Sequence, residues 1–264
     1  MAGTNQKGAS NMKVEILATG SNGNCIHLQS GSTGILIDAG KWKRDLEKRL
    51  LARGINAATD IQAVFITHSH GDHIRGLTLA NKYRVQVWAT EGEWKGISGV
   101  DEELRRVLET RWSKYDPVQI GELTIHPFRT HHNTYEPVGY AIEDDSGARA
   151  CVVFDTGHID DEMLDMMEGS GIYIIEANHD SDMLLYGPYD DYLKERISDP
   201  HRGHLSNDQT AAALQKLIKG RGERIYLTHL SSNNNTPELA SQAARLALFE
   251  KGLINKRDYY LEVV

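Results

Sequence analysis

The chain has 264 residues, of which 40% are apolar and 25% charged, and its formal net charge is −8. This length suits one α/β domain with a large core, or at most two small domains. The negative balance argues against a surface coated with DNA-binding charge, although bound metal dications would add positive charge that the formal count omits.

The ends and the cysteines indicate how the chain is organised. The first eleven residues are polar and lack the apolar core of an export signal, and no apolar run approaches the roughly 20 residues of a membrane helix. We expect a flexible leader over residues 1–12, one catalytic domain over residues 13–264, a cytoplasmic location and no membrane contact. Cys25 and Cys151 lie in apolar segments, so we expect buried thiols, not a disulfide.

Apolar or alternating segments recur along the chain between glycine-rich turns and stretches of helical spacing. In the first half we expect, in chain order, strands at residues 13–18, 25–29 and 34–38, a helix at 42–53, a strand at 61–67, a helix at 74–83, a strand at 85–89 and a helix at 91–111. In the second half we expect strands at 117–120, 123–129, 138–143 and 150–154, a helix at 162–167, a strand at 172–176, a less regular stretch at 182–202, a helix at 207–218, a strand at 224–228 and a helix at 237–251. Strands in both halves with helices between them predict an α/β fold, an αββα sandwich of two mixed β-sheets flanked by helices.

A segment with the letters THSHGDH follows directly on the predicted strand at residues 61–67. It holds four potential metal ligands within six residues, His68, His70, Asp72 and His73. Imidazole nitrogen and carboxylate oxygen both suit zinc. The first two histidines, at alternate positions, can converge on one ion, and the last two residues can face a second ion. A surface loop or a single adventitious site is the alternative, but four ligands at the end of a buried strand argue against it.

Further polar residues stand at the ends of other apolar strands, namely Asp38, His131, His132, Asp155 and His229. An apolar strand that delivers a polar residue to a loop is how α/β enzymes place catalytic groups on a rigid frame. Each residue alone is more often a capping aspartate or an exposed histidine. The repetition of the pattern favours one shared site.

Together these segments resemble the metallo-β-lactamase superfamily, whose HxHxDH signature the histidine-rich segment matches, and the resemblance covers nearly everything from Lys13 onward. It implies two divalent metal ions, zinc or alternatively manganese. It implies a first ion on His68, His70 and His132, a second on Asp72, His73 and His229, and Asp155 as the bridge between them. Asp38 would orient the ligand loop without touching metal. His132 is preferred to His131 because the residues after it look like the family's His-Asp-x-x-Glu-Pro stretch, with Asn133 in place of the aspartate.

Four further stretches, with the letters ATGSNGN, EANHD, GHLSN and THLSSNNN, look like the YycJ (WalJ) branch of that superfamily. The cluster departs from this branch at Ser69 and Gly71, which are not ligand positions. The branch is associated with exonucleolytic cleavage of DNA, which implies a phosphodiesterase acting on single-stranded nucleic-acid ends. A metal-bridging hydroxide would attack phosphorus in line with the leaving oxygen, and Asp72 would serve that centre.

Three other functions stay open at this point. A phosphodiesterase for small cyclic nucleotides is favoured by the acidic balance and by the lack of a basic, aromatic groove. A hydrolase of carbon esters, thioesters or lactams would use the same metals. A binding module that has lost the site is disfavoured by the intact ligand set. The partner we expect is a nucleic-acid or nucleotide substrate, with a homodimer left open.

Two histidines outside the ligand set are candidates for acid catalysis. His204 lies in a glycine-flanked loop before a predicted helix, and His179 follows a buried strand. Each is either a loop residue or a proton donor to the leaving oxygen. Four other histidines have no ligand-like context, and we expect structural or surface roles for His27, His126, His158 and His201.

Overall fold

The computed structural model describes residues 12–112 and 114–264, whose strands form two large sheets and a small ribbon. The first sheet has the order β1 (Lys13–Ala18), β2 (Cys25–Ser30), β3 (Thr33–Ile37), β4 (Ala63–Phe65), β5 (Gln86–Ala89) and β6 (Arg105–Val107). The second has the order β15 (Tyr259–Val263), β14 (Glu223–Thr228), β13 (Ile172–Glu176), β12 (Arg149–Val153), β11 (Val138–Asp144), β10 (Leu123–Arg129) and β9 (Val118–Ile120). The ribbon pairs β7 (Thr110–Arg111) with β8 (Lys114–Tyr115).

Each large sheet mixes antiparallel and parallel pairs. In the first sheet, β1 to β3 are antiparallel neighbours, and β3 to β6 are parallel. In the second, β9 to β12 are antiparallel, and β12 to β15 are parallel. Parallel neighbours end at the same sheet edge, so the residues that follow them are brought together.

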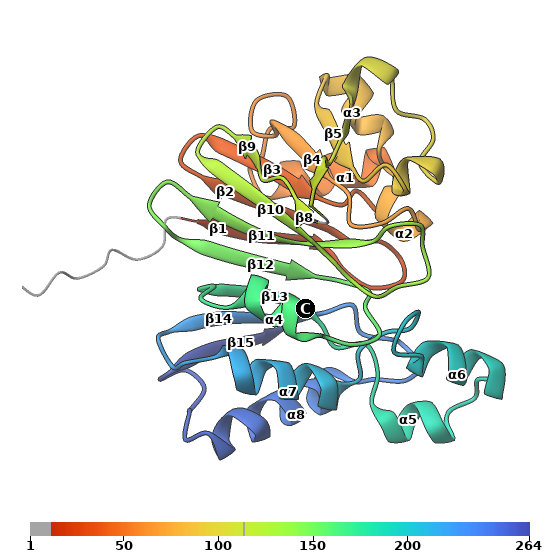
Figure 1. Ribbon diagram of the computed structural model, residues 1–264, viewed down its shortest axis with the longest axis vertical. Coiled ribbons are helices and arrows are strands. Elements are labelled where there is room, and N and C mark those ends of the chain that lie inside the picture. The colour runs from red at the N-terminus through yellow and green to blue at the C-terminus, as the bar shows by residue number, and fades with distance from the viewer. Residues whose placement is uncertain (1–11, 113) are drawn as a thin grey trace, which may run out of the picture.

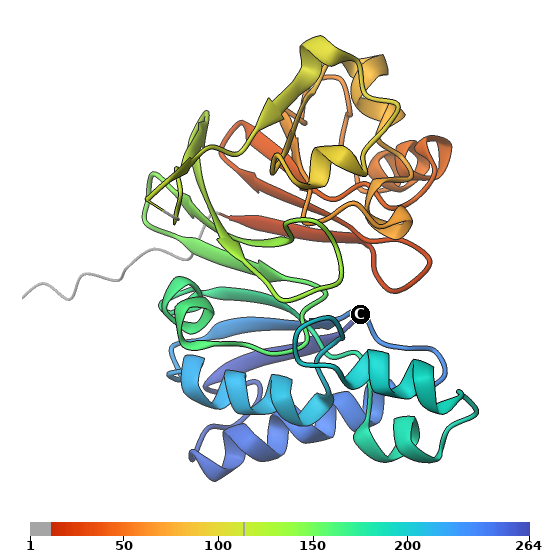
Figure 2. The same ribbon diagram turned by 45° about the vertical axis from the view of Figure 1, so that its right-hand side comes forward.

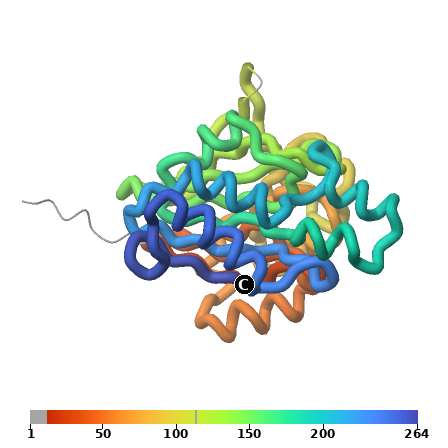
Figure 3. Tube along the Cα trace, turned by 90° about the horizontal axis from the view of Figure 1, so that it is seen from below, coloured from red at the N-terminus to blue at the C-terminus, as the bar shows by residue number. Residues whose placement is uncertain are grey.

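Helices cover the outer face of each sheet (Figures 1 and 2). The α-helices of the described residues are α1 (Lys43–Ala52), α2 (Gly71–Ile74), α3 (Thr78–Tyr83), α4 (Asp161–Met167), α5 (Ser181–Tyr186), α6 (Asp191–Ser198), α7 (Asn207–Leu217) and α8 (Pro237–Glu250). Seen from below, α7 and α8 lie side by side, and α5 and α6 project at one end of the molecule (Figure 3).

Three apolar layers hold these elements together, as alternation along β3 illustrates. Ile35 and Ile37 belong to the core between the two sheets. Leu36 points the other way and packs in the layer that includes Leu46 and Leu50 of α1. A third layer lies between the second sheet and α4, α7 and α8. Because side chains alternate across a strand, each inner strand feeds two layers. The predicted αββα sandwich is confirmed.

Most expected elements are present, but residues 91–111 are not a helix. They form two 3-10 turns, Glu93–Lys95 and Glu102–Leu104, before β6 and β7. Gly92, Gly96 and Gly99 interrupt the helical spacing, and Gly99 has a φ of +76°, a conformation that a helix cannot contain. The irregular stretch at 182–202 contains most of α5 and all of α6. β15 was not predicted, although its residues Tyr259–Val263 are mostly apolar.

The start of the chain differs by one residue from the expectation. Met12, which we placed in the leader, is only 1% exposed and packs between the sheets, so it belongs to the folded part. Residues 1–11, the rest of the expected leader, lie outside the described residues. Cys25 and Cys151 are buried free thiols as predicted. In the described part of the chain, every helix is too short or too polar to cross a membrane.

Candidate metal centre

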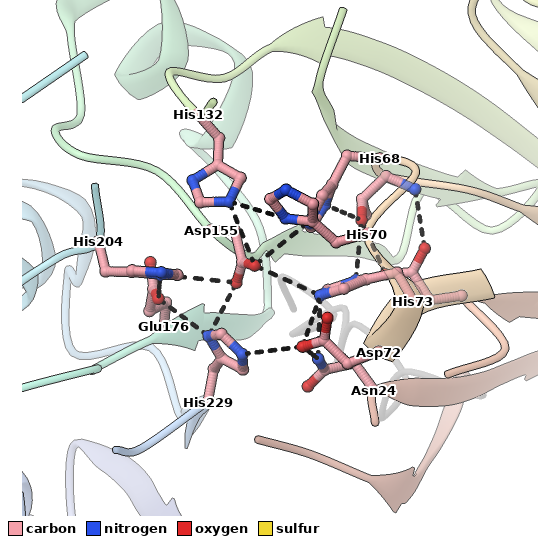
Figure 4. Close-up of polar contacts among 12 residues, drawn as sticks. Asn24, His68, His70, Asp72, His73, His132, Asp155, Glu176, His204 and His229 are labelled. Atoms are coloured by element: carbon pink, nitrogen blue, oxygen red, sulfur yellow. Dashed lines mark hydrogen bonds and ion pairs between the residues drawn. The ribbon is translucent and has the colours of Figure 1, made fainter. Parts of the chain in front are cut away.

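The predicted ligands meet at one edge where the two sheets come together (Figure 4). Asp38 follows β3 and the histidine-rich segment follows β4, both in the first sheet. His132 follows β10, Asp155 follows β12 and His229 follows β14, all in the second sheet. The site therefore depends on both halves of the chain.

Three histidines of the centre converge on one carboxylate oxygen. Nδ1 of His70 lies 3.1 Å from Nε2 of His68 and 3.2 Å from Nε2 of His132. Oδ2 of Asp155 lies 3.3 Å from Nε2 of His68 and 3.7 Å from Nε2 of His132. Each of the four residues offers one ligand atom within 4.8 Å of the others, so this set could hold one metal ion.

A second set lies on the other side of Asp155. Oδ2 of Asp72 is 3.6 Å from Nε2 of His73 and 3.8 Å from Nε2 of His229. Oδ2 of Asp155 is 3.3 Å from Nε2 of His73, and its Oδ1 is 2.8 Å from Nδ1 of His229. One carboxylate thus touches both sets, as a residue between two ions would.

Hydrogen bonds from Nδ1 fix the proton of several rings and leave the lone pair on Nε2. Nδ1 of His132 donates to the carbonyl oxygen of Gly203 at 3.0 Å. Nδ1 of His73 donates to Oδ2 of Asp38 at 2.6 Å, and Nδ1 of His229 to Oε1 of Glu176 at 3.0 Å. Carbonyl and carboxylate oxygens only accept, so the proton sits on Nδ1 and Nε2 can bind metal.

Asp38 holds the histidine-rich loop by three contacts. Besides His73, its carboxylate accepts from the backbone N–H of Thr67 at 2.8 Å and from the Thr67 hydroxyl at 2.8 Å. Its side chain is fully buried. This geometry suits the orienting role that the resemblance implied.

Two buried polar atoms in the centre lack hydrogen-bond partners, Oδ1 of Asp155 and Nε2 of His229. The short contact of that oxygen with Nδ1 of His229 does not have hydrogen-bond geometry. A buried polar atom without a partner is destabilising by about 1–3 kcal/mol. Both atoms are metal-ligand types, so a bound dication would satisfy them. The residues present therefore fit a metal centre.

The titration of the histidines supports the same conclusion. Burial lowers the pKa of His70 to about 4 and that of His132 to about 3, so both rings are neutral near pH 7. Burial also acts to lower the pKa of His73, but the Asp38 and Asp155 carboxylates outweigh it and raise that pKa to about 10. The centre thus combines free imidazole lone pairs with negative charge that attracts cations.

Three residues of the centre have left-handed backbone conformations. The φ angles are 60° at Asp38, 39° at Asp155 and 56° at His229. Such conformations are unfavourable for residues other than glycine and concentrate at functional sites. Each follows the last residues of a strand, where the turn aims its side chain into the centre.

Glu176 is a central residue to which we assigned no role from the sequence. It ends β13 and is fully buried, and its Oε1 accepts from Nδ1 of His204 at 2.6 Å. Its Oε2 accepts from the backbone N–H of Thr156 at 3.1 Å. It shows the same pattern as Asp155, a carboxylate at the end of an apolar strand, so that signal could have found it.

Asn24 was also missed, and no ligand-like spacing marks it. It is fully buried, its Nδ2 lies 3.0 Å from Nε2 of His73, and its Oδ1 accepts from the backbone N–H of Gly20 at 2.9 Å. The glycine-rich turn before β2 therefore supports the centre from the side of the first sheet.

The remaining candidates fall in different places. His204 lines a cavity of about 390 Å³ over the centre, together with His70, Asp72 and Arg196. His179 is buried and does not line this cavity, and burial lowers its pKa to about 4. The ring of His131 lies outside the centre and pairs with Asp160, which leaves His132 as the histidine that the fold brings to the ligand set.

Comparisons with known proteins agree with this fold. Residues 33–230 match the Beta-lactamase superfamily domain, and the chain therefore belongs to the beta-lactamase superfamily. It is 33% identical to exodeoxyribonuclease YycJ of Bacillus anthracis over 91% of this chain and 90% of that protein. It is 35% identical to exodeoxyribonuclease WalJ of Streptococcus pneumoniae serotype 2 (strain D39) over 86% of this chain and 85% of that protein. The metallo-beta-lactamase fold protein YhfI of Bacillus subtilis has the same fold, with a TM-score of 0.70 at 17% identity over 96% and 95% of the two chains. The resemblance predicted from the sequence is confirmed.

Proposed function

We propose that this chain is a metal-dependent phosphodiesterase that removes nucleotides from the ends of single-stranded DNA. The observation that carries the proposal is its similarity, over most of its length, to relatives named exodeoxyribonucleases, combined with a complete set of ligand residues. Its ligands come from both sheets, so we propose that the whole folded part acts as one catalytic domain.

We propose two metal ions in the centre. His68, His70 and His132 would hold one ion, Asp72, His73 and His229 the other, and Asp155 would bridge them. Bound dications polarise a phosphoryl oxygen and make water more acidic. Nitrogen and carboxylate ligands together favour zinc, with manganese as the alternative. Asp38 would fix the ring of His73 through its Nδ1–H, which is the support that metal-binding histidines commonly have.

His204 is the residue that we propose as the proton donor to the leaving oxygen. Its Nδ1 is bonded to Glu176, so its Nε2 lies on the opposite edge of a ring that lines the cavity. Burial acts to lower the pKa of His204, but the Glu176 carboxylate outweighs this effect and raises the pKa above its usual value. The ring therefore keeps its proton to a higher pH than an ordinary histidine does. His179, which is neutral near pH 7 and lies outside the cavity lining, is less suited to this role.

The rim of the cavity provides positive charge for a phosphate. Arg196 of α6 lines the cavity. Its guanidinium group makes no hydrogen bond or ion pair with any described residue. Arg202, also in the lining, is paired with Asp199 at 2.8 Å. A free guanidinium binds phosphate by two parallel hydrogen bonds. This local charge supports an anionic substrate in spite of the net charge of −8.

The test is an assay of zinc- and manganese-loaded protein on several substrates in parallel. We expect single-stranded DNA oligonucleotides to be shortened to mononucleotides, and labels at the 5′ or 3′ end to give the polarity. Cyclic mononucleotides and a thioester probe the alternatives. If a cyclic mononucleotide or the thioester is hydrolysed while the oligonucleotides stay intact, the nuclease proposal is overturned in favour of that substrate class. An Asp155→Asn variant serves as the inactive control.

Two expectations from the sequence remain predictions. We propose a cytoplasmic location, which fractionation of cells would test. A homodimer would be recognised by light scattering of the purified protein.

A further inference from the structure

Three histidines form a second cluster outside the centre described above. They are His131, His158 and His201, two of which we expected to be structural or surface residues. One nitrogen of each ring lies within 4.8 Å of the others. The rings of His131 and His158 stack at 3.9 Å between centroids, and the ring of His201 lies 5.7 Å from that of His158.

Hydrogen bonds fix the protons of two of these rings. Nε2 of His131 donates to Oδ2 of Asp160 at 2.7 Å. Nδ1 of His158 donates to the carbonyl oxygen of Pro200 at 2.6 Å. Both acceptors are oxygens that cannot donate, so Nδ1 of His131 and Nε2 of His158 carry lone pairs in the neutral rings. Neither nitrogen makes a hydrogen bond within the described residues.

This arrangement is typical of histidines that bind metal. Such a histidine donates its other ring N–H to a carboxylate or to a backbone carbonyl, which sets its orientation and raises its basicity. Asp160 is itself fixed, because its Oδ1 accepts from the backbone N–H of Met163 as the cap of α4. The two supports are therefore held in place by the fold.

Each histidine of the cluster lies close in the chain to a residue of the main centre. His131 directly precedes His132, His158 comes three residues after Asp155, and His201 comes three residues before His204. Each histidine thus lies on one of three loops that carry a residue of the main centre. An ion bound here would tie these three loops together.

We propose that His131, His158 and His201 form an additional site for one transition-metal dication, which clamps the loops of the main centre. Three neutral imidazoles favour Zn²⁺, Ni²⁺, Co²⁺ or Cu²⁺ over Mg²⁺ or Ca²⁺, which prefer oxygen. The exposed side chain of His201 gives the ion access from solvent. Because a bound ion lies in the plane of each imidazole ring, binding to both His131 and His158 requires their stacked rings to turn relative to each other.

The test is the metal content of the full chain, and the total expected rests on the two ions proposed for the main centre. We expect protein loaded with Zn²⁺ or Co²⁺ and then freed of excess metal to hold three equivalents. The double variant His158→Phe/His201→Ala should hold two and should lose part of the Co²⁺ visible absorption. The single variant His201→Ala, at an exposed position, repeats the test where folding is not at risk. His126→Ala, which removes a histidine outside both sites, should still hold three.

A second pair of measurements separates the two sites. His68→Ala/Asp72→Ala should lose metal from the main centre and keep the equivalent that depends on His158 and His201. The proposal is overturned if both cluster variants hold as many equivalents of metal as the parent protein. In that case the nuclease assay would be unaffected, so the two proposals fail separately.

Discussion

Asp155 links the two ligand sets through a single carboxylate. Its Oδ2 lies 3.3 Å from Nε2 of both His68 and His73. The side chain is almost fully buried, and Oδ1 has no hydrogen-bond partner within the described residues. Because burial of an unsatisfied carboxylate is unfavourable, its position is better explained by metal binding than by folding alone.

At the residue scale, the first prediction concerns His204. His204→Ala should keep the metal content of the parent protein, because we do not propose this ring as a ligand. Hydrolysis of an oligonucleotide should fall by about 10²–10⁴-fold, the usual range for a general acid. Steady-state rates and metal analysis measure both effects.

A substrate with a good leaving group provides the control for His204→Ala. Bis(p-nitrophenyl) phosphate needs no proton on its leaving oxygen, so its hydrolysis should fall much less. Equal losses on both substrates would contradict the role of proton donor.

The second prediction concerns the pH dependence that Glu176 imposes on His204. The donor works in its protonated form, so activity should be lost as pH rises through the raised pKa of His204. Glu176→Gln removes the negative charge that raises this pKa, and the alkaline limb of kcat/KM should move to lower pH. A nearby opposite charge favours the protonated form of the ring, so the direction of the expected move is fixed.

The pH profile distinguishes this effect from simple damage to the site. Glu176 also accepts from His229, so metal content must be measured at each pH. A variant with full metal and an unmoved alkaline limb would show that Glu176 does not set the pKa of the acid.

At the element scale, the ends of neighbouring strands build the centre. β3 and β4 are parallel neighbours, as are β12, β13 and β14. Their carboxyl ends present Asp38, the histidine-rich loop, Asp155, Glu176 and His229 at a common edge. Strands held by ladder hydrogen bonds position these groups more rigidly than loops alone could.

The segment containing α6 carries the third prediction. Arg196→Ala should raise KM for an oligonucleotide with little change in kcat, because the guanidinium binds phosphate at the rim of the cavity. The dependence of KM on salt concentration should also weaken, since one phosphate contact is lost. Arg44→Ala, which removes an exposed charge from α1, is the matched control.

The outcome that contradicts the role of α6 is an Arg196→Ala variant whose KM and salt dependence equal those of the control. Arg196→Lys adds a finer test. It keeps the charge and loses the planar pair of donors, so an intermediate KM is expected.

At the scale of the whole molecule, the metal centre joins the two sheets. His73 comes from the first sheet's loops, and Asp155 and His229 come from those of the second. Without metal, several buried carboxylates and imidazoles face one another at this junction. Bound ions therefore act as a link between the halves of the sandwich as well as a catalytic device.

The fourth prediction follows from this link. Removal of metal with a chelator should lower the melting temperature, and zinc or manganese should restore it. At a free metal concentration of about 1,000 times Kd, one bound ion stabilises the folded state by about 4 kcal/mol. Calorimetry with and without chelator measures the change.

Calcium provides the control for metal removal. It prefers oxygen ligands alone and should not restore the melting temperature. An equal melting temperature with and without chelator would mean that the centre does not link the two sheets.

Local sequence patterns were enough to predict the αββα architecture and most of the residues that meet at the candidate centre. Alternation along β1 and β10 and the continuous apolar run of β13 reflect local packing, which the pattern of apolar residues records directly. The candidate ligands between His68 and His73 all lie within one short segment, so their spacing in the sequence is enough to reveal them. Local spacing led to a wrong prediction at residues 91–111, where we expected a helix. The turns and short strands found there have a polarity similar to that of a helix, and glycines interrupt the helical spacing.

Only the tertiary structure decided which residues from distant segments meet. It brought Glu176 to His204 and Asn24 to His73, although 28 and 49 positions separate the members of these pairs. It also placed His131 with His158, away from the neighbouring His132. Adjacent residues at a strand end can face opposite directions, and loops from different strands converge only once the sheets have packed. These contacts depend on strand order and register, which local sequence does not encode.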